Sequence, residues 1–175
     1  PLTILGPIAG GYCEIDGSVS SQLLTGLLMA LPLAAKTSEI KVNNLKSKPY
    51  IDMTIQLLKS FGITIINKDY SVFQIPGNQK YTPQNYNVEG DWSGGAFLLV
   101  AGAVNGQLTV NGLRTDSMQS DMAIIKALDK AGAKMKLSEN QIEISKSELK
   151  AFDFDATDSP DLFPPLVALA SYCAG

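Results

Sequence analysis

The stretch SSQLLTGLLMALPLAAKTSEIKVNNL, residues 20–45, resembles the later stretch SGGAFLLVAGAVNGQLTVNGL, residues 93–113. In both stretches, small or polar residues precede a strongly apolar segment, and alternating residues typical of a strand follow it. The similarity continues further along the chain, where DMTI at Asp52 matches DMAI at Asp121. The chain therefore contains two copies of one structural unit, and a third copy begins at Ser159.

Each copy has the pattern of a βαβαββ unit. An opening strand, GYCEID (residues 11–16) or NYNVEG (residues 85–90), is followed by the apolar helix, a second strand, an amphipathic helix and two closing strands. The closing strands are ITIIN with SVFQI in the first copy and AKMKL with IEIS in the second. Because the first helix of each copy has hardly any polar face, we expect it to be interior. The sequence thus predicts an α/β (α+β) fold of repeated units with interior helices.

The amphipathic helices are each expected to bury one face. The residues at helical spacing are Ile51, Ile55, Leu58 and Phe61 in the first copy and Met122, Ile125, Leu128 and Ala131 in the second. Gly62 and Gly132 follow these faces and predict the helix ends, since glycine readily adopts the left-handed conformation that stops a helix.

Composition excludes several classes of function. The chain has 175 residues, of which 45% are apolar and 18% charged, which favours a folded core over disorder. Its net charge of −3 gives no electrostatic case for binding nucleic acid or an anionic membrane. No apolar run reaches the roughly 18 residues of a membrane span. Histidine is absent and the two cysteines lie far apart, so we expect no metal site.

Polar residues are crowded before the first apolar helix. Ser20, Ser21 and Gln22 stand at its start. A serine at a helix start is a routine N-cap. A helix start is also a ready anion site, because its free amides and dipole favour negative charge and the side chains add neutral donors. The second copy has Ser93 followed by two glycines, so the fold itself does not require the SSQ side chains.

Four motifs, in this order, resemble the 5-enolpyruvylshikimate-3-phosphate synthase family. They are DGSVSSQ (residues 16–22), SKPYID (residues 47–52), VEGD (residues 88–91) and SPD (residues 159–161). The resemblance covers essentially the whole chain. It implies an enzyme of two domains, each built from three βαβαββ units, in which the chain crosses between domains near VEGD. Residues 1–88 would be the last unit of one domain, and residues 89–175 the first unit and the start of the next unit of the second domain. We therefore expect an internal fragment.

The resemblance implies a transferase of the shikimate pathway of aromatic amino acid and chorismate biosynthesis. The enolpyruvyl group of phosphoenolpyruvate passes to the 5-hydroxyl of shikimate 3-phosphate, phosphate leaves, and no metal or organic cofactor takes part. It further implies a cytoplasmic, monomeric full-length enzyme whose partners are these two small molecules, with no nucleic acid and no membrane. An enolpyruvyl transferase with another acceptor, such as UDP-N-acetylglucosamine, and a non-catalytic repeat module remain as alternatives.

The same resemblance assigns roles to six residues. Ser20, Ser21 and Ser47 bind shikimate 3-phosphate through its phosphate region, and Tyr50 packs beside it. Gln22 contacts both shikimate 3-phosphate and phosphoenolpyruvate. Without the resemblance, Ser47 and Tyr50 are equally well explained as a helix start with a packed tyrosine, since Pro49 suits the first helical turn.

Asp161 is the sixth residue and the expected catalytic one. By resemblance it binds the shikimate hydroxyls and accepts the proton of the attacking 5-hydroxyl. A carboxylate at a helix start is favoured by the dipole in any case, so a purely structural role is the alternative. Asp158 lies close by but matches no motif position.

Arginine is scarce in the chain. Phosphoenolpyruvate carries a phosphate and a carboxylate, which bidentate arginines bind well. Arg114 is the only arginine. We therefore expect the chain to be inactive alone, with the basic residues of the site lying outside it.

Overall fold

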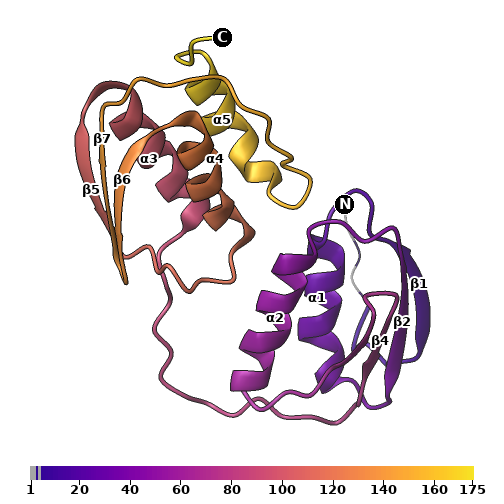
Figure 1. Ribbon diagram of the computed structural model, residues 1–175. Helices are drawn as coiled ribbons and strands as arrows, with labels where there is room; N and C mark the ends of the chain where they lie inside the picture. Colours follow the sequence, from indigo (N-terminus) through magenta and orange to yellow (C-terminus); the bar gives the residue numbers. More distant parts are fainter. Residues whose placement is uncertain (1–2, 4) are drawn as a thin grey trace. The chain divides into compact units, whose positions relative to one another are not determined.

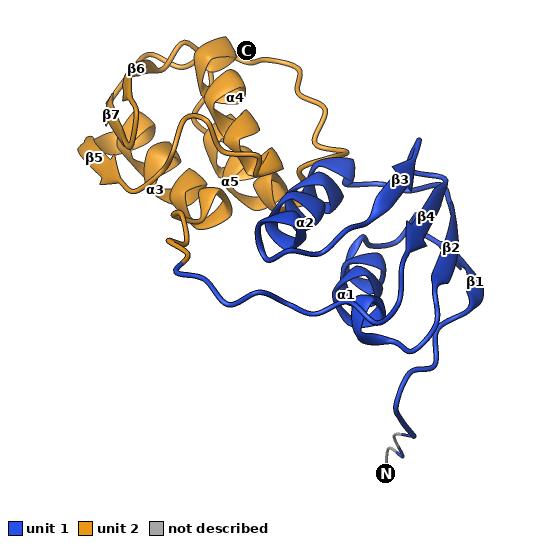
Figure 2. Cartoon of the chain, turned by 90° about the horizontal axis from the view of Figure 1, so that it is seen from below, with its two compact units in different colours: residues 1–85 blue, residues 86–175 orange. Residues whose placement is uncertain are grey.

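The computed structural model describes residue 3 and residues 5–175. The chain divides into two compact units, residues 1–85 and 86–175, coloured separately in Figure 2. The sequence places the boundary after residue 88. The assignment of the two parts to different domains of a longer enzyme stays a prediction.

Unit 1 has the strand and helix order of a βαβαββ unit. Its elements are β1 (Tyr12–Asp16), α1 (Gln22–Ala30) with a 3₁₀ turn (Leu31–Leu33), β2 (Ser38–Asn43), α2 (Lys48–Ser60), β3 (Ile66–Lys68) and β4 (Val72–Ile75). The sheet order is β1-β2-β4-β3, with β1 parallel to β2 and the other neighbours antiparallel. Both helices lie on one face of this sheet (Figure 1).

The core of unit 1 lies between that sheet face and the two helices. Ile40 and Val42, two residues apart on β2, are buried, while Lys41 between them is exposed, as the alternation of a strand requires. They pack with Leu24 and Leu28 from α1. From α2, Ile51 and Leu58 are buried as expected; Thr54 joins them, whereas Ile55 and Phe61 are only partly buried.

Unit 2 lacks the expected opening strand. Its elements are α3 (Trp92–Asn105), β5 (Gln107–Asn111), a 3₁₀ turn (Ser120–Ala123), α4 (Ile124–Ala131), β6 (Lys134–Ser138), β7 (Gln141–Ser145), a second 3₁₀ turn (Pro160–Leu162) and α5 (Phe163–Ala170). The sheet order is β5-β7-β6, all antiparallel. The prediction of a strand at residues 85–90 is wrong. The amide of Gly90 reaches the carbonyl of Gly112 at 3.0 Å, but Val88 is 81% exposed, so this stretch buries no apolar face.

The helices of unit 2 cover one face of their sheet, and α5 packs against α3 (Figure 1). The buried face of α4 is turned from the expected one. Leu128 and Ala131 are buried as predicted, but Ile124 and Ala127 replace Met122 and Ile125 as its other buried residues. The helix begins only at Ile124, because the residues before it form the tighter 3₁₀ turn.

The two glycine stops are confirmed. Gly62 and Gly132 have φ angles of 81° and 85°, in the left-handed region where glycine is favoured. The apolar first helices bury their sheet-facing sides, whereas Leu23 and Met29 of α1 and Phe97 and Leu98 of α3 are about half exposed. Across the described residues, no helix combines the length and apolar character that a bilayer crossing requires.

Candidate functional site

Two loops of unit 1 meet at the carboxyl ends of its parallel strands. β1 and β2 pair in register up to Asp16 and Asn43, and α1 and α2 begin a few residues beyond. The amide of Gly17 donates to the Asn43 carbonyl at 2.8 Å, and the amide of Lys46 donates to the Gly17 carbonyl at 3.2 Å. Ligands of α/β folds commonly bind beyond the carboxyl ends of such strands.

The approach of these loops depends on the missing side chain of Gly17. A Cβ atom there would lie 2.9 Å from Cδ1 and 3.0 Å from Cα of Leu45. Further along, the helices also touch, because the hydroxyls of Thr25 and Thr54 lie 3.5 Å apart. The structure therefore brings the starts of α1 and α2, and the predicted residues on them, to the same end of unit 1.

The two serines at the start of α1 differ, because Ser20 makes a capping hydrogen bond and Ser21 does not. Ser21 occupies the N-cap position with φ −73° and ψ −12°, which are helical rather than extended values. Within the described part of the chain its side chain makes no capping hydrogen bond, although it is buried. The Oγ of Ser20 accepts the amide of Gln22 at 3.1 Å, which leaves its hydroxyl proton available to an acceptor. The plain N-cap interpretation is therefore wrong for Ser21.

The second copy shows a filled cap at the matching place. Asp91 precedes α3 in an extended conformation, and its carboxylate accepts the amides of Ser93 at 3.1 Å and Gly94 at 3.0 Å. The hydroxyl of Ser93 also donates to Asp91. The helix start is thus capped by a carboxylate that accepts two amides in unit 2, and by the neutral Ser20 hydroxyl, which accepts one amide, in unit 1.

Ser47 begins α2 in a strained conformation. Its φ of 53° and ψ of 42° are left-handed, which is uncommon for a residue other than glycine. It is 8% exposed, and, as far as the described residues go, its side chain does not cap the helix. Its carbonyl accepts the amide of Tyr50 at 3.2 Å, and the carbonyl of Tyr50 accepts the hydroxyl of Thr54 at 2.8 Å. Hydrogen bonds thus hold the backbone at the start of α2, whereas the Ser47 hydroxyl makes no hydrogen bond that is found among the described residues.

A cavity of about 580 Å³ adjoins the start of α2. Its lining includes Ser18, Lys46, Lys48 and Tyr70, but none of the six predicted residues. On the adjacent loop, the amide of Ser18 donates to the Asp16 carboxylate at 2.9 Å, and this hydrogen bond is the main reason the pKa of Asp16 is lowered. The two lysines make this end of unit 1 attractive to an anion.

A group that the sequence analysis missed lies beside this cavity. The hydroxyl of Tyr70 is 2.8 Å from both carboxylate oxygens of Asp52. The ammonium of Lys48 lies over the same ring, 5.2 Å from its centre. The hydrogen bond to Asp52 raises the pKa of Tyr70. Asp52 belongs to the SKPYID motif, but its partner is remote in sequence, so the motif gave no sign of the contact.

Asp161 lies in unit 2, in the 3₁₀ turn Pro160–Leu162 that leads into α5. Its side chain is exposed, whereas the neighbouring Ser159 is buried and its hydroxyl donates to the Ser120 carbonyl at 2.9 Å. This contact ties the turn to the start of the preceding helical segment. Asp158 is also exposed. The structure presents the Asp161 carboxylate on a turn that this hydrogen bond holds in place.

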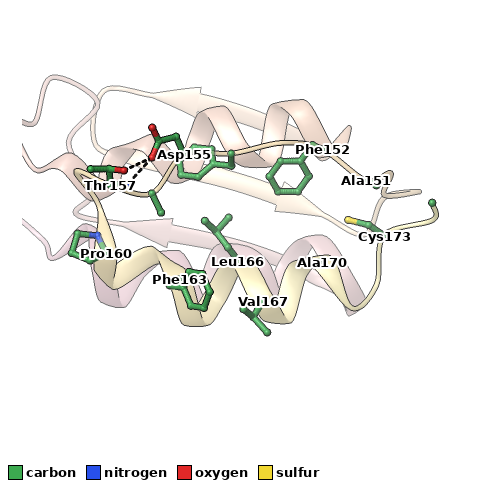
Figure 3. Close-up of a pocket in the computed structure, with 13 residues that line it drawn as sticks. Ala151, Phe152, Asp155, Thr157, Pro160, Phe163, Leu166, Val167, Ala170 and Cys173 are labelled. Carbon is green, nitrogen blue, oxygen red and sulfur yellow. Dashed lines mark hydrogen bonds between the residues drawn. The ribbon is translucent and has the colours of Figure 1, made fainter.

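A cavity of unit 2 is mostly apolar and does not include Asp161. It has about 810 Å³ and lies between residues 151–157 and α5, where Phe152, Phe163 and Val167 line it (Figure 3). Asp155 is directed to Thr157, whose amide and hydroxyl both donate to it (Figure 3). Such a lining suits packing better than binding of an anionic sugar-like substrate.

The single arginine is engaged by a neighbouring carboxylate. Arg114 pairs with Asp116 through contacts of 2.9 and 2.7 Å, which raise the pKa of Arg114 and lower that of Asp116. Among residue 3 and residues 5–175, no three His, Cys, Asp or Glu side chains gather as a metal site.

Comparisons with known proteins agree on one family. A family model described as EPSP synthase (3-phosphoshikimate 1-carboxyvinyltransferase) matches residues 1–175. Proteins named 3-phosphoshikimate 1-carboxyvinyltransferase are 43% identical in Clostridium novyi and 42% identical in Photorhabdus laumondii, each over 100% of this chain. The chain covers 40% and 42% of those two proteins, so it spans about two fifths of their length.

Two solved structures share the fold. An EPSP synthase from Acinetobacter baumannii superposes with a TM-score of 0.69 and 21% identity, over 96% of this chain and 40% of that one. The enolpyruvyl transferase NikO from Streptomyces tendae gives a TM-score of 0.69 and 18% identity, over 93% of this chain and 42% of its own. At these identities the likeness concerns the fold alone.

Proposed function

The chain belongs to the EPSP synthase family, and from this premise we propose that it forms part of the shikimate 3-phosphate site of a 3-phosphoshikimate 1-carboxyvinyltransferase. The full-length enzyme transfers the enolpyruvyl group of phosphoenolpyruvate to the 5-hydroxyl of shikimate 3-phosphate and releases phosphate. The cytoplasmic location and monomeric state expected from the family resemblance are part of the same proposal.

The observation that carries the proposal is the pair of unused serine hydroxyls at neighbouring helix starts. Ser21 and Ser47 are each 8% exposed and stand at N-cap positions without capping, and their loops are bonded together through Gly17. A hydroxyl that does not serve its own helix is free to donate to a phosphate oxygen, where the helix dipoles add their attraction. Ser20 and the carboxamide of Gln22 extend the same row of neutral donors.

In this site the remaining predicted residues act on the ring. Tyr50 packs beside the shikimate, and Gln22 contacts phosphoenolpyruvate as well. Asp161 holds the shikimate hydroxyls and takes the proton of the 5-hydroxyl as its oxygen bonds to the enolpyruvyl carbon. Protonation of the methylene, together with this attack, gives the tetrahedral intermediate, and loss of phosphate together with one proton from the new methyl group restores the double bond. A carboxylate that orients and accepts in this way acts as a general base.

The cations that neutralise phosphoenolpyruvate must come from outside the chain. Arg114 is engaged with Asp116, and Lys46 and Lys48, which line one cavity of unit 1, are point charges that cannot make the bidentate contacts of arginine. We therefore expect the 175-residue chain by itself to be inactive.

The test uses the full-length enzyme. Replacing both Ser20 and Ser21 by Ala removes two donors to a charged phosphate, so the KM for shikimate 3-phosphate should rise by about tenfold or more, with a smaller change in kcat. The control is Ser93→Ala, which removes the hydroxyl at the matching place of the other copy and should leave that KM unchanged. An unchanged KM in the double variant refutes the phosphate assignment.

Asp161 is tested in the same enzyme. Asp161→Ala should lower kcat by about 10²- to 10⁴-fold, the usual contribution of a general base, while the protein stays folded. Asp158→Ala, an exposed carboxylate on the same segment, is the matched control and should keep its turnover. Near-normal turnover of Asp161→Ala removes the base assignment. Competition by UDP-N-acetylglucosamine in place of shikimate 3-phosphate would point to a different acceptor.

A further inference from the structure

Left-handed residues other than glycine gather around the start of α2. Asn44, Ser47, Asp69 and Tyr70 have φ angles of 53°, 53°, 50° and 58°. All but Ser47 line the cavity of about 580 Å³ beside this helix start. Residues in this region of φ/ψ space are strained, and they persist only where the surrounding contacts hold them there. The contacts of these four residues therefore keep them in the left-handed conformation.

Of these four residues, Tyr70 has the bulkiest side chain, so its left-handed backbone conformation costs the most free energy. It sits with Asp69 in the turn between β3 and β4, where the amide of Ser71 donates to the Lys68 carbonyl at 3.0 Å. Hairpin turns with two left-handed residues favour Gly or Asn there, and a bulky side chain is an outlier. The amide of Tyr70 donates to the side chain of Asn67 at 2.8 Å, which fixes the turn from the strand side.

The ring of Tyr70 reaches from this turn to α2. Its hydroxyl donates to Asp52, and Lys48 lies over its face. Lys48 is the first residue of α2 and Asp52 lies one turn later, so the ring contacts the opening turn of the helix at two points. Ser47 immediately precedes that turn. Among the hydrogen bonds, ion pairs and ring contacts found for the described residues, Tyr70 is the only residue of the sheet or its turns that contacts both Lys48 and Asp52.

We infer that Tyr70 is a positioning residue for shikimate 3-phosphate binding, which it serves by holding the opening turn of α2, and with it Ser47, in the conformation that directs the Ser47 hydroxyl to the phosphate. This inference rests on the proposed function. Tyr70 does not touch the substrate in this scheme. Its hydrogen bond to Asp52 and its contact with Lys48 oppose the relaxation of Ser47 out of its left-handed conformation.

The experiment measures the KM for shikimate 3-phosphate, kcat and the thermal midpoint of full-length variants. Tyr70→Phe removes the hydroxyl and keeps the ring. We expect the KM to rise about fivefold to tenfold with kcat changed less than about twofold, because phosphate binding acts equally on the ground and transition states. Asp52→Asn keeps an acceptor for the tyrosine hydroxyl, so its KM should stay closer to the parent value than that of Asp52→Ala.

Tyr12→Phe is the matched control. The hydroxyl of Tyr12 donates to the Glu14 carboxylate at 3.3 Å on the exposed face of β1, so its removal also deletes a tyrosine–carboxylate hydrogen bond from unit 1. It should leave the KM unchanged. A Tyr70→Phe enzyme with a lower thermal midpoint but an unchanged KM would make Tyr70 merely structural and overturn the inference.

A double-mutant cycle with Ser47→Ala separates this inference from the proposed function. If Tyr70 acts through Ser47, Tyr70→Phe raises the KM much less in the Ser47→Ala background than in the parent. If both effects multiply fully, the inference is wrong although Ser47 still binds the phosphate. If Ser47→Ala alone leaves the KM unchanged, the phosphate role of Ser47 fails, and the positioning role of Tyr70 fails with it.

Discussion

Replacing Gly17 by Ala should separate the two loops that carry the predicted phosphate donors. The added Cβ would lie 2.9 Å from Leu45 Cδ1, 3.0 Å from Leu45 Cα and 3.2 Å from Val42 Cγ1. The end of the Leu45 side chain can turn away, but its Cα cannot move without the backbone of the second loop. Val42 is 4% exposed and packed in the core, so it cannot yield freely either.

The cost has two parts. Forcing one extra methyl into a packed site costs about 1–3 kcal/mol. If the loops move apart to relieve the contact, the hydrogen bonds Gly17–Asn43 and Lys46–Gly17 lengthen, each worth about 1 kcal/mol. A loss of about 2–3 kcal/mol lowers the midpoint of thermal unfolding by roughly 4–12 °C in a domain of about 150–250 residues, and by about twice as much in a domain the size of unit 1. The KM for shikimate 3-phosphate should rise as well, since Ser21 and Ser47 stand on the two separated loops.

The assay is thermal unfolding followed by circular dichroism, together with KM measurements on the full-length enzyme. Gly26→Ala is the control, because a Cβ at Gly26, inside α1, has no neighbour within 4 Å among the described residues. That change should stabilise the helix by about 0.5–1 kcal/mol. If Gly17→Ala matches the parent in both midpoint and KM, the close approach of the loops does not position the site, and the geometric reasoning fails.

Two further predictions concern the cap of α3 and the ring of Tyr70. Asp91→Ala removes a filled N-cap and should destabilise unit 2 by about 1 kcal/mol while the KM for shikimate 3-phosphate stays the same; thermal unfolding and kinetics of one preparation decide it, and a raised KM would contradict the purely structural role of Asp91. The pKa of Tyr70 is raised above its ordinary 10.0 by Asp52, so its protonated form favours the folded state; this stabilisation is complete below about pH 10 and is lost as the pH rises through the raised value. The difference in unfolding midpoint between parent and Tyr70→Phe should therefore be constant from about pH 7 to 9 and shrink at higher pH, and a difference that grows there would reverse the sign assigned to this hydrogen bond.

The repeat and the order of its elements could be predicted from sequence because they depend on local periodicity. Apolar spacing located both amphipathic helices, and Gly62 and Gly132 ended them where the left-handed conformation was needed. The strand at residues 85–90 could not be judged in this way. Whether an extended stretch becomes a strand depends on whether a neighbouring strand edge is available for pairing. Within residues 85–90, the amide of Gly90 donates to the carbonyl of Gly112, which follows α3 and β5 in the chain.

The residues proposed for the site come from the sequence, whereas their local geometry could not be predicted from it. Helix starts with hydroxyl side chains are visible in SSQ and SKPY, and the family resemblance assigned them a phosphate. The left-handed Ser47 and the helical backbone of Ser21 are not visible, because both follow from tertiary contacts of the loops. The contact of Tyr70 with Asp52 joins residues on a hairpin and a helix, which no local pattern links.

The two copies of the repeat also separate capping from ligand binding more cleanly than either copy could alone. In both copies a helix follows a short stretch of polar residues, and the first amides of each helix need hydrogen-bond acceptors from outside the helix. In unit 2 the Asp91 carboxylate meets that need, and the negative charge it brings would repel a phosphate. In unit 1 the residues at the helix start are neutral: the Ser20 hydroxyl accepts the amide of Gln22, and Ser21 makes no capping hydrogen bond. We therefore propose that the start of α1, where one neutral serine hydroxyl is the cap, binds the phosphate, whereas the start of α3, where a carboxylate is the cap, does not.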